Sequence, residues 1–455
     1  MPTIGKSKRR RIGSRADIVE NSDPSSELLS RLAEVFSEPA IDELRRQTGY
    51  NPRKRVATAF RLLYCCVEAS LCGKTLGFAT IRAFFLKRFG NIRPRAFQLR
   101  FKSSEAVAFF RGALGLIVES ITKEFSPSLT KHLSGFDDVM LYDGTGQRAP
   151  KRARTNGLKA TSPDSAGSKW VIGYSLRNGI AIEAIPGSGT SAEIPMWKEL
   201  VPQMRENVLY LLDLGFYCRH VYEEAIAQNA HLLMRLKADT TNLRDKLRVI
   251  QAQENGRVAK LRNQYTFSSY LRRANRFAFQ TIDLDVYWGM GESQMRLRVV
   301  GVRKNKRWHL YLTTLTQEQM SSDNVAETYR LRWLIEFLFR EWKQQTDWGR
   351  SATADKNALE ALTYAALISH ALVRSIRIAT ALKHECGLDT IRPLACMHVV
   401  RAYASELISA LLTRNLASWL RTTQRMLSTV FLLAYELRPS CSRPRIARNL
   451  GALGG

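Results

Sequence analysis

Short apolar runs, separated by turn-forming residues, lie between residues 138 and 236 and constrain the fold more than any other feature of the sequence. Runs of this kind are typical of strands, and the stretches between the later runs have helical periodicity. The predicted strands lie at 139–142, 170–176, 180–185, 208–212 and 231–236, and the predicted helices at about 192–205 and 219–229. An antiparallel three-stranded meander followed by helix, strand, helix and strand predicts an α/β core with a mixed sheet.

Helical patterns lie on both sides of this core, and a basic segment interrupts it. Within residues 238–306 the stretches 277–286 and 295–302 are strand-like, which predicts a β-rich basic insertion. The predicted domains are a flexible basic arm (1–24), a helical DNA-binding domain (25–130), a core in two parts (131–237 and 307–385) around the insertion (238–306), and a C-terminal helical region with a basic tail (386–455).

The charge balance indicates a polyanionic partner. The 455 residues include 69 Lys and Arg against 41 Asp and Glu, a net charge of +28, and the positive residues recur in every segment. DNA or RNA is the simplest partner for such a chain. Membrane-surface binding is the alternative, but the sequence shows no amphipathic anchor, no lipidation signal and no run of about 20 uncharged apolar residues. We therefore expect a nucleic acid, and no membrane, as the partner.

Cysteine usage and the N-terminus predict where the protein works. The seven cysteines form no paired framework, as expected of free thiols in a reducing compartment. The basic N-terminus is not followed by the apolar segment of a signal peptide. Both features predict a soluble intracellular protein.

The segment 329–343 predicts one amphipathic helix that begins near Asp323. Its apolar side consists of Leu331, Leu334, Ile335, Leu338 and Trp342. At about 100° per residue, Tyr329, Arg332, Glu336 and Lys343 share an arc of roughly 60° on the other side, with Arg340 beside it. An ordinary surface helix also carries mixed charges. A carboxylate flanked by a phenol and cations, however, suits a nucleic-acid backbone passing a metal-binding acid.

Two aspartates complete a candidate metal site. Asp143 and Asp213 each follow an apolar strand and precede a glycine-containing turn. Each alone is most simply a turn-forming residue. If their strands are adjacent, both carboxylates lie at one edge of the sheet, where Glu336 could join them. Hard divalent cations such as Mg²⁺ prefer carboxylate oxygen, and two of them about 3.5–4 Å apart can promote phosphodiester displacement.

These motifs resemble those of a known family. Asp143-Gly144-Thr145, Asp213-Leu214-Gly215-Phe216 and the signature Tyr329-x2-Arg332-x3-Glu336-x6-Lys343 resemble DDE transposases of the bacterial insertion-sequence-four family, whose hallmark is Y-R-E-K. The resemblance covers roughly residues 135–385. It implies a ribonuclease-H-like core with a β-rich insertion. Leu214, Phe337 and the loosely similar insertion depart from better-known members.

The resemblance implies cut-and-paste transposition of an insertion sequence, through cleavage at transposon ends, a hairpin intermediate and strand transfer into target DNA. Asp143, Asp213 and Glu336 would ligate two Mg²⁺ ions, with Mn²⁺ as a substitute. Tyr329, Arg332, Lys343 and Arg340 would bind DNA phosphates. The partners would be transposon-end DNA and target DNA, bound by a homodimer in the bacterial cytoplasm at the nucleoid.

Further residues are candidates for DNA contacts. The resemblance suggests that Trp308, or else Trp288, stacks on a flipped base, and core packing is the alternative for both. Other DNA-binding candidates are Arg53, Lys54, Arg55, Arg235 and Lys237.

Two other functions fit the same residues. One is a metal-dependent DNA nuclease or resolvase of the same fold that cleaves without joining. The other is a non-catalytic DNA-binding protein, which the presence of Asp143, Asp213 and Glu336 disfavours.

Overall fold

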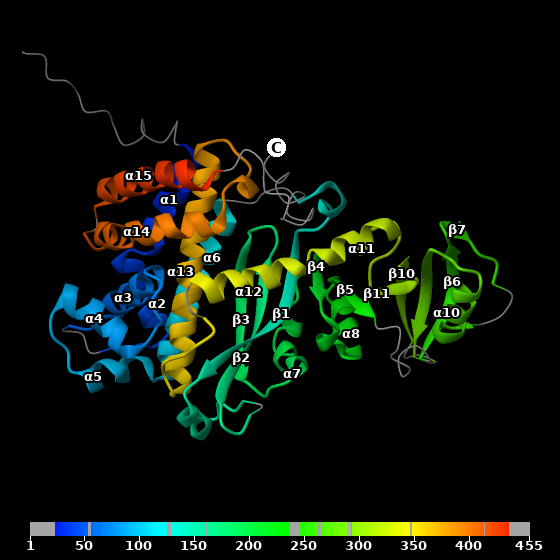
Figure 1. Cartoon of the computed structure of the whole chain (residues 1–455), viewed down its shortest axis with the longest axis horizontal. Coiled ribbons are helices and arrows are strands. Elements are labelled where there is room, and N and C mark those ends of the chain that lie inside the picture. Colours follow the sequence, from blue (N-terminus) through cyan, green and yellow to red (C-terminus); the bar gives the residue numbers. More distant parts are fainter. Residues whose placement is uncertain are drawn as a thin grey trace, which may run out of the picture.

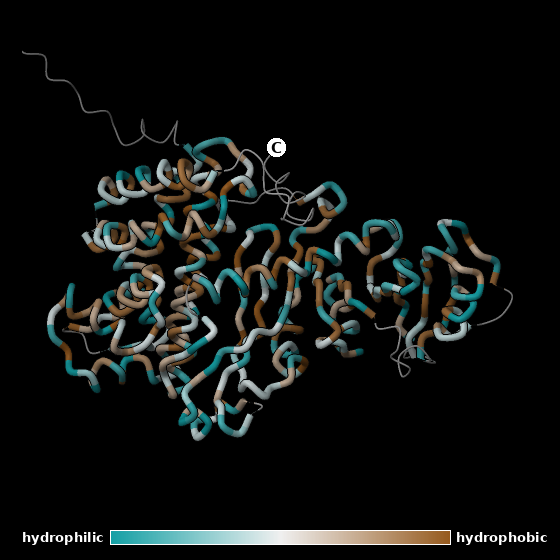
Figure 2. The backbone as a smooth tube through the Cα atoms, viewed as in Figure 1, coloured by the Kyte–Doolittle hydropathy of each residue, from teal (hydrophilic) through white to brown (hydrophobic). Residues whose placement is uncertain are grey.

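The computed structural model describes residues 23–52, 56–124, 129–160, 162–236, 246–261, 265–289, 291, 294–345, 348–413 and 415–435. A helical region lies at one end of the molecule, a sheet runs through its middle, and the insertion lies at the other end (Figure 1). Hydrophobic segments concentrate in the central strands and helices, whereas hydrophilic segments lie mainly in the loops and the outer helices (Figure 2).

The central sheet begins with the predicted strands. An antiparallel meander is formed by β1 (Asp138–Ala149), β2 (Ala166–Ser175) and β3 (Ile180–Ser188). Two parallel strands, β4 (Val208–Leu212) and β5 (His231–Leu236), follow beside β1 in the order β3-β2-β1-β4-β5. Every residue of β4 is buried, as expected of a parallel strand covered on both faces. The predicted α/β fold class with a mixed sheet between helical regions is confirmed.

The connections differ in detail from those predicted. The helix expected over 192–205 is divided into α7 (Glu193–Trp197) and a 3-10 turn at Val201–Gln203, which contains Pro202. Proline lacks the N–H that a continuous helix needs there. The second predicted helix is α8 (Arg219–Ala227).

The insertion continues the same sheet. Its strands are β6 (Leu247–Glu254), β7 (Arg257–Val258), β8 (Tyr265–Thr266), β9 (Thr281–Trp288) and β10 (Met295–Lys304). Strand β11 (Arg307–Thr313) pairs antiparallel with both β10 and β5, so the full order runs β3-β2-β1-β4-β5-β11-β10-β9-β6-β7. The predicted domain boundaries remain predictions, because the sheet passes from core to insertion without a break among the described residues.

Part of the insertion is helical, which the sequence analysis missed. Helix α10 (Phe267–Arg276) is capped by the Thr266 side chain, which accepts a hydrogen bond from the Ser269 N–H at 3.2 Å. Its buried residues are Phe267, Tyr270, Leu271 and Ala274, which share one helical face. The first residues of the predicted strand 277–286 therefore end this helix, and the strand begins at Thr281.

The flanking helices form one bundle around a central helix. Helix α13 (Lys356–Lys383) packs against β3 and the surrounding helices. The helices in contact with α13 are α1 (Pro24–Val35), α3 (Ala59–Leu71), α6 (Ser104–Glu124), α14 (Pro393–Leu412) and α15 (Leu416–Ala434). Around them, α2 (Glu38–Gln47) packs on α3 and α6, α4 (Phe78–Phe89) on α3, and α5 (Pro94–Gln98) on α4. Two helices of this bundle, α13 and α14, are long and apolar enough to cross a membrane. In their most apolar 18-residue stretches, however, 83% and 50% are buried within the protein.

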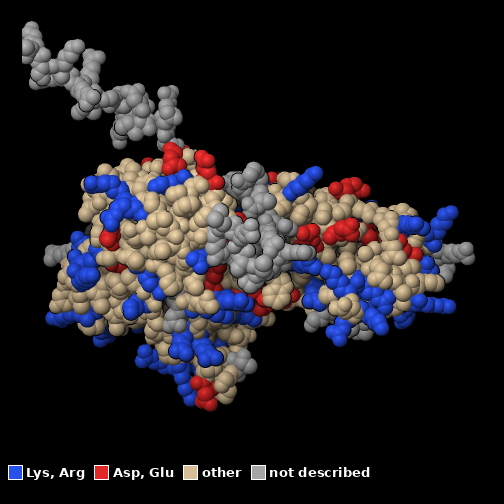
Figure 3. Space-filling view, turned by 45° about the horizontal axis from the view of Figure 1, so that its top comes forward, with Lys and Arg blue, Asp and Glu red and all other residues tan. Residues whose placement is uncertain are grey.

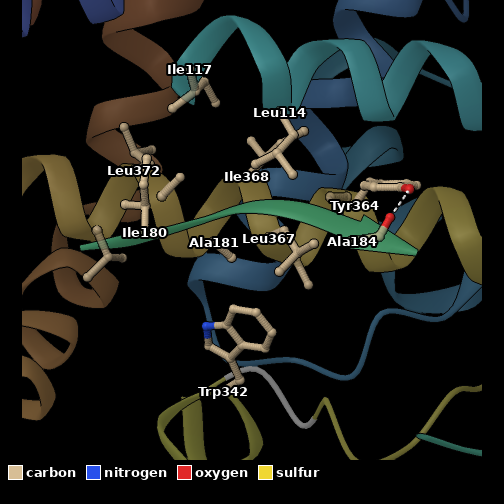
Figure 4. Close-up of a cluster of buried hydrophobic side chains, with 14 of the residues drawn as sticks. Leu114, Ile117, Ile180, Ala181, Ala184, Trp342, Tyr364, Leu367, Ile368 and Leu372 are labelled. Atoms are coloured by element: carbon tan, nitrogen blue, oxygen red, sulfur yellow. Dashed lines mark hydrogen bonds between the residues drawn. The ribbon is translucent and has the colours of Figure 1, made fainter. Parts of the chain in front are cut away.

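The bundle and the sheet share one hydrophobic core. Strand β3, with Ile180, Ala181 and Ala184, runs alongside α13, with side chains of α6 on one side and Trp342 on the other (Figure 4). The Tyr364 hydroxyl of α13 donates a hydrogen bond to the Ala184 carbonyl at 2.8 Å, fixing the helix along the strand.

The segment 329–343 is not one helix. The structure has α11 (Ser322–Arg330) and α12 (Trp333–Gln345), joined by a turn at Leu331 and Arg332. The N–H groups of Leu331, Arg332 and Leu334 each donate to the carbonyl three residues earlier, at 3.0, 3.1 and 2.9 Å. Three-residue spacing tightens the chain and changes the direction of side chains beyond it. The predicted polar row is therefore wrong as the face of a single helix.

A buried ion pair holds the insertion to the segment before α11. The Arg298 guanidinium bonds both carboxylate oxygens of Asp283, at 2.8 and 2.7 Å. It also donates to the Thr316 and Met320 carbonyls at 3.0 and 2.7 Å. Arg298 and Asp283 side chains are only 4% and 9% exposed.

Replacing Arg298 with Met should destabilise the protein strongly, because Asp283 would remain as a buried unpaired charge, at a cost of about 3–5 kcal/mol. The matched control is Arg296→Met on the same strand. Arg296 pairs with Asp285 but is 67% exposed, so its loss should cost less than about 1 kcal/mol. Thermal unfolding measures both. Equal melting temperatures for the two variants would contradict the prediction.

Candidate active site

Asp143 and Asp213 lie side by side, each directly after the last paired residue of the adjacent parallel strands β1 and β4. Strands β1 and β4 are in register up to Tyr142 opposite Leu212, and each aspartate is the next residue. Asp213 directly precedes the 3-10 turn Leu214–Phe216, in agreement with the predicted turn. Asp143 differs from the prediction, since β1 continues through it to Ala149, paired with β2. It therefore lies where the parallel pairing ends rather than where the strand ends.

Arg332 brings Glu336 to the same place. Its guanidinium lies 3.2 Å from Asp143 Oδ2 and 2.9 Å from Glu336 Oε1. The Arg332 side chain is only 11% exposed. Burial acts to lower its pKa, but the Tyr329 phenol and the Asp213, Asp143 and Glu336 carboxylates outweigh burial and raise it. All three predicted acids therefore lie around this one cation.

Asp143 is held in an environment that favours its protonated form. Burial raises the pKa of Asp143 to about 6, against the opposing effects of Arg332 and of the Gly144 N–H, which donates to Oδ1 at 2.8 Å. The negative charges of Asp213 and Glu193 raise this pKa further. A perturbed carboxyl beside other carboxyls is typical of functional sites.

The three acids have the chemistry of a metal site but not its arrangement. Carboxylate oxygens suit hard divalent cations. Within the part of the chain that the structure describes, however, no group of three or more His, Cys, Asp or Glu side chains is placed to hold a metal ion. Two of the three acids bond to Arg332 instead. The metal-ligand roles of Asp143, Asp213 and Glu336 remain predictions.

The predicted phosphate-binding residues are divided between the interior and the surface. Tyr329 is 8% exposed, its hydroxyl donates to the Leu212 carbonyl at 3.3 Å, and its ring packs on Tyr311. Burial raises its pKa. Lys343 and Arg340 are exposed on α12, with the Arg340 guanidinium over the Phe337 ring. Tyr329 and Lys343 therefore do not lie in one exposed row, because the turn at Arg332 separates their helices.

The two tryptophan candidates differ. Trp288 is 6% exposed, and its ring stacks on Tyr217 at 5.4 Å with an interplanar angle of 18°. This position favours the packing interpretation. Trp308 is half-buried, and its indole N–H donates to Asn275 Oδ1 at 2.8 Å. Base stacking by Trp308 stays a prediction.

Basic residues extend from the site toward the insertion. Arg235 is exposed on β5, and its positive charge lowers the pKa of His309, as do the charges of Lys304 and Arg330, although burial has the larger effect. Lys and Arg side chains spread over one face from the helical region to the insertion (Figure 3). The other candidates, Arg53, Lys54, Arg55 and Lys237, lie outside the described residues.

Sequence reasoning missed a fourth acid, Glu193, whose carboxylate lies 3.1 Å from Lys169 Nζ. It belongs to none of the motifs, although it lies only 20 residues before Asp213 (213 − 193 = 20). The sequence signal for this acid was the glycine shortly after each predicted aspartate, Gly144 and Gly215, where a side chain would meet Glu193.

Comparison with known proteins shows related sequences. A model of the transposase DDE domain matches residues 134–372. The transposase of insertion sequence element IS231F of Bacillus thuringiensis subsp. israelensis is 22% identical over 389 residues, covering 77% of this chain and 79% of that protein. The transposase of IS231C of Bacillus thuringiensis subsp. berliner is 20% identical, with 72% and 75% covered. A solved piggyBac transposase synaptic complex with hairpin DNA aligns with a TM-score of 0.42 and 11% identity over 94% of this chain and 89% of that one.

The raised pKa of Asp143 has a consequence for stability. In the unfolded chain its pKa is near 3.8, and in the folded protein it is about 6. The folded state therefore binds the proton more tightly, and ionisation of Asp143 destabilises the fold as pH rises from about 4 through 6, by up to about 3 kcal/mol.

We therefore expect Asp143→Asn to raise the melting temperature at pH 7.5, where Asp143 is ionised, and to change it much less at pH 5. Measurements in a chelating buffer keep divalent cations from contributing. Asp164→Asn is the control, since the Asp164 side chain is 81% exposed. An equal effect of Asp143→Asn at both pH values would contradict the burial argument.

Proposed function

The chain belongs to the DDE transposase family, whose members are enzymes of DNA cleavage and strand transfer, and we propose that it moves an insertion sequence by a cut-and-paste route. Its partners would be transposon-end DNA and target DNA, engaged by a homodimer in the bacterial cytoplasm at the nucleoid. A hairpin intermediate is part of the proposal.

The observation that carries this proposal is the meeting of three acids around Arg332. Asp143 and Asp213 come from adjacent parallel strands, and Glu336 comes from α12, which packs against β1. Both aspartates lie at least 123 residues before Glu336 in the chain (336 − 213 = 123), so only folding brings the three acids together. Three carboxylates near one guanidinium leave an excess of negative charge, which supports a role in binding further cations.

The family implies dependence on a divalent metal, and we propose Mg²⁺, with Mn²⁺ as a substitute, held by Asp143, Asp213 and Glu336. When bound, the metal supplies Lewis acidity for phosphodiester displacement. In the structure Arg332 forms hydrogen bonds with two of these acids, Asp143 and Glu336. Because a guanidinium also forms strong bidentate hydrogen bonds with phosphate, the DNA backbone can compete for Arg332 and free the carboxylates.

The surrounding residues would then hold the substrate. Lys343 and Arg340 are exposed at the far end of α12 and can bind phosphates of the strand to be cut. Buried Tyr329 would support the site indirectly, since its hydroxyl fixes α11 to the end of β4 beside Asp213.

The test is an assay with linear DNA that carries the ends of the element. Wild-type protein with Mg²⁺ should cleave the ends and join precut ends to a target. Glu336→Gln should reduce both by at least about a thousandfold, because an acid at the reacting centre is lost, while end binding persists. Glu199→Gln, an exposed residue on the surface, is the control.

Cleavage without joining would favour the alternative, a metal-dependent nuclease or resolvase. Unchanged Mg²⁺-dependent cleavage by Glu336→Gln would show that the catalytic acid is elsewhere. End binding with no cleavage by the wild type would favour a non-catalytic DNA-binding protein.

Lys343→Ala should weaken binding of transposon ends about equally for all sequences. One phosphate contact fewer should reduce the slope of log affinity against log salt by about 1. Lys343→Arg, which keeps the charge, should bind nearly as the wild type does. An unchanged salt slope in Lys343→Ala would mean that Lys343 does not contact a phosphate.

A further inference from the structure

Glu193 lies behind the two predicted catalytic aspartates. It is the first residue of α7, and its side chain is 22% exposed. Its Oε1 atom lies 3.1 Å from the Nζ atom of Lys169 on β2. An exposed pair of this kind would add little to stability, but this pair is partly covered and lies beside the candidate active site.

The Glu193 carboxylate touches the backbone after each aspartate. A Cβ atom on Gly144 would lie 2.3 Å from Oε1, and a Cβ atom on Gly215 would lie 2.4 Å from Oε2. Neither glycine has the positive φ that only glycine adopts easily. Space for this carboxylate, rather than backbone conformation, therefore explains glycine at both positions.

The contact comes from the face of the sheet opposite to Arg332. Successive side chains of a strand point to opposite faces, so Asp143 and Gly144 face different sides of β1. Asp143 meets Arg332 on one side, and Gly144 meets Glu193 on the other. Glu193 thus supports the site from behind without entering the space between the three acids.

The backbone needs support at this point. The paired register of β1 and β4 ends at Tyr142 and Leu212, so no further ladder pair fixes the distance between the residues that follow. The Glu193 carboxylate contacts both segments that follow, at Gly144 and Gly215, where the hydrogen-bonded pairing of β1 and β4 has ended. The negative charge of Glu193 also contributes to the raised pKa of Asp143, which places it electrostatically within the site.

We propose that Glu193, held by Lys169, is a positioning residue that sets the separation of the backbone segments carrying Asp143 and Asp213. The proposal rests on the proposed function, since it assigns those aspartates to catalysis.

A double-mutant cycle of Gly215→Ala and Glu193→Ala tests this contact. Each single variant should lower the rate of end cleavage at saturating DNA and Mg²⁺ at least tenfold, with end affinity changed less than threefold. Adding Gly215→Ala to Glu193→Ala should cost less than a further twofold, because the methyl group then meets no carboxylate. The control is Gly146→Ala, also on β1, where an added Cβ has no neighbour within 4 Å and the rate should stay within twofold.

Glu193→Gln, which keeps the shape of the side chain and can still accept a hydrogen bond from Lys169, should retain at least a third of the wild-type rate. If the rate reductions of the two single variants multiplied in the double variant, the two residues would act independently and the contact would be overturned. A Glu193→Ala variant that cleaves normally, whatever its melting temperature, would overturn the positioning role. If the wild type did not cleave ends, the proposed function itself would fail. The same cycle measured by melting temperature would still report whether the contact exists.

Discussion

The site depends on one cation, the Arg332 guanidinium, among three carboxylates. Its bonds to Asp143 and Glu336 tie the first strand of the sheet to α12 across 189 residues of chain. The same group is predicted to bind a DNA phosphate. Two of its N–H groups make these bonds, and its buried Nε atom has no hydrogen-bond partner in the described part of the chain, so donors remain for a phosphate. One side chain therefore contacts two of the acids and is also predicted to contact the substrate.

Arg332 reaches this position because the polypeptide turns there. If 322–345 were one straight helix, Tyr329, Arg332 and Glu336 would point the same way. Instead, α11 ends at Arg330, with Tyr329 anchored on the Leu212 carbonyl, and α12 begins at Trp333. The turn lets the buried Tyr329 phenol approach the end of β4 while the Arg332 guanidinium approaches Asp143 within β1. The signature therefore spans two helices that pack on different strands of the sheet, α11 on β5, β10 and β11 and α12 on β1.

Much of this could be predicted from the sequence, because short apolar strands and the aspartates that follow them are local signals. The sequence left the adjacency of β1 and β4 as a condition for bringing Asp143 and Asp213 together, and the strand order of the folded chain supplies it. The break at Leu331 could not be predicted, since the apolar periodicity runs through it and tertiary contacts decide it. Glu193 could not be predicted either. Its role depends on the space above Gly144 and Gly215, which exists only in the folded chain.

A cluster of acids must also admit a polyanion, and the pairing of charges explains how it can. Arg332 faces the acids from the front and Lys169 pairs with Glu193 behind them. Each pair removes negative charge that would repel phosphates within the Debye length of about 10 Å at 0.1 M salt. The net charge of +28 attracts DNA as it comes within the same screening length of the surface. Under the proposed function, a DNA phosphate would draw Arg332 away from the acids, and this charge pairing would then favour the reactive arrangement in the DNA-bound protein.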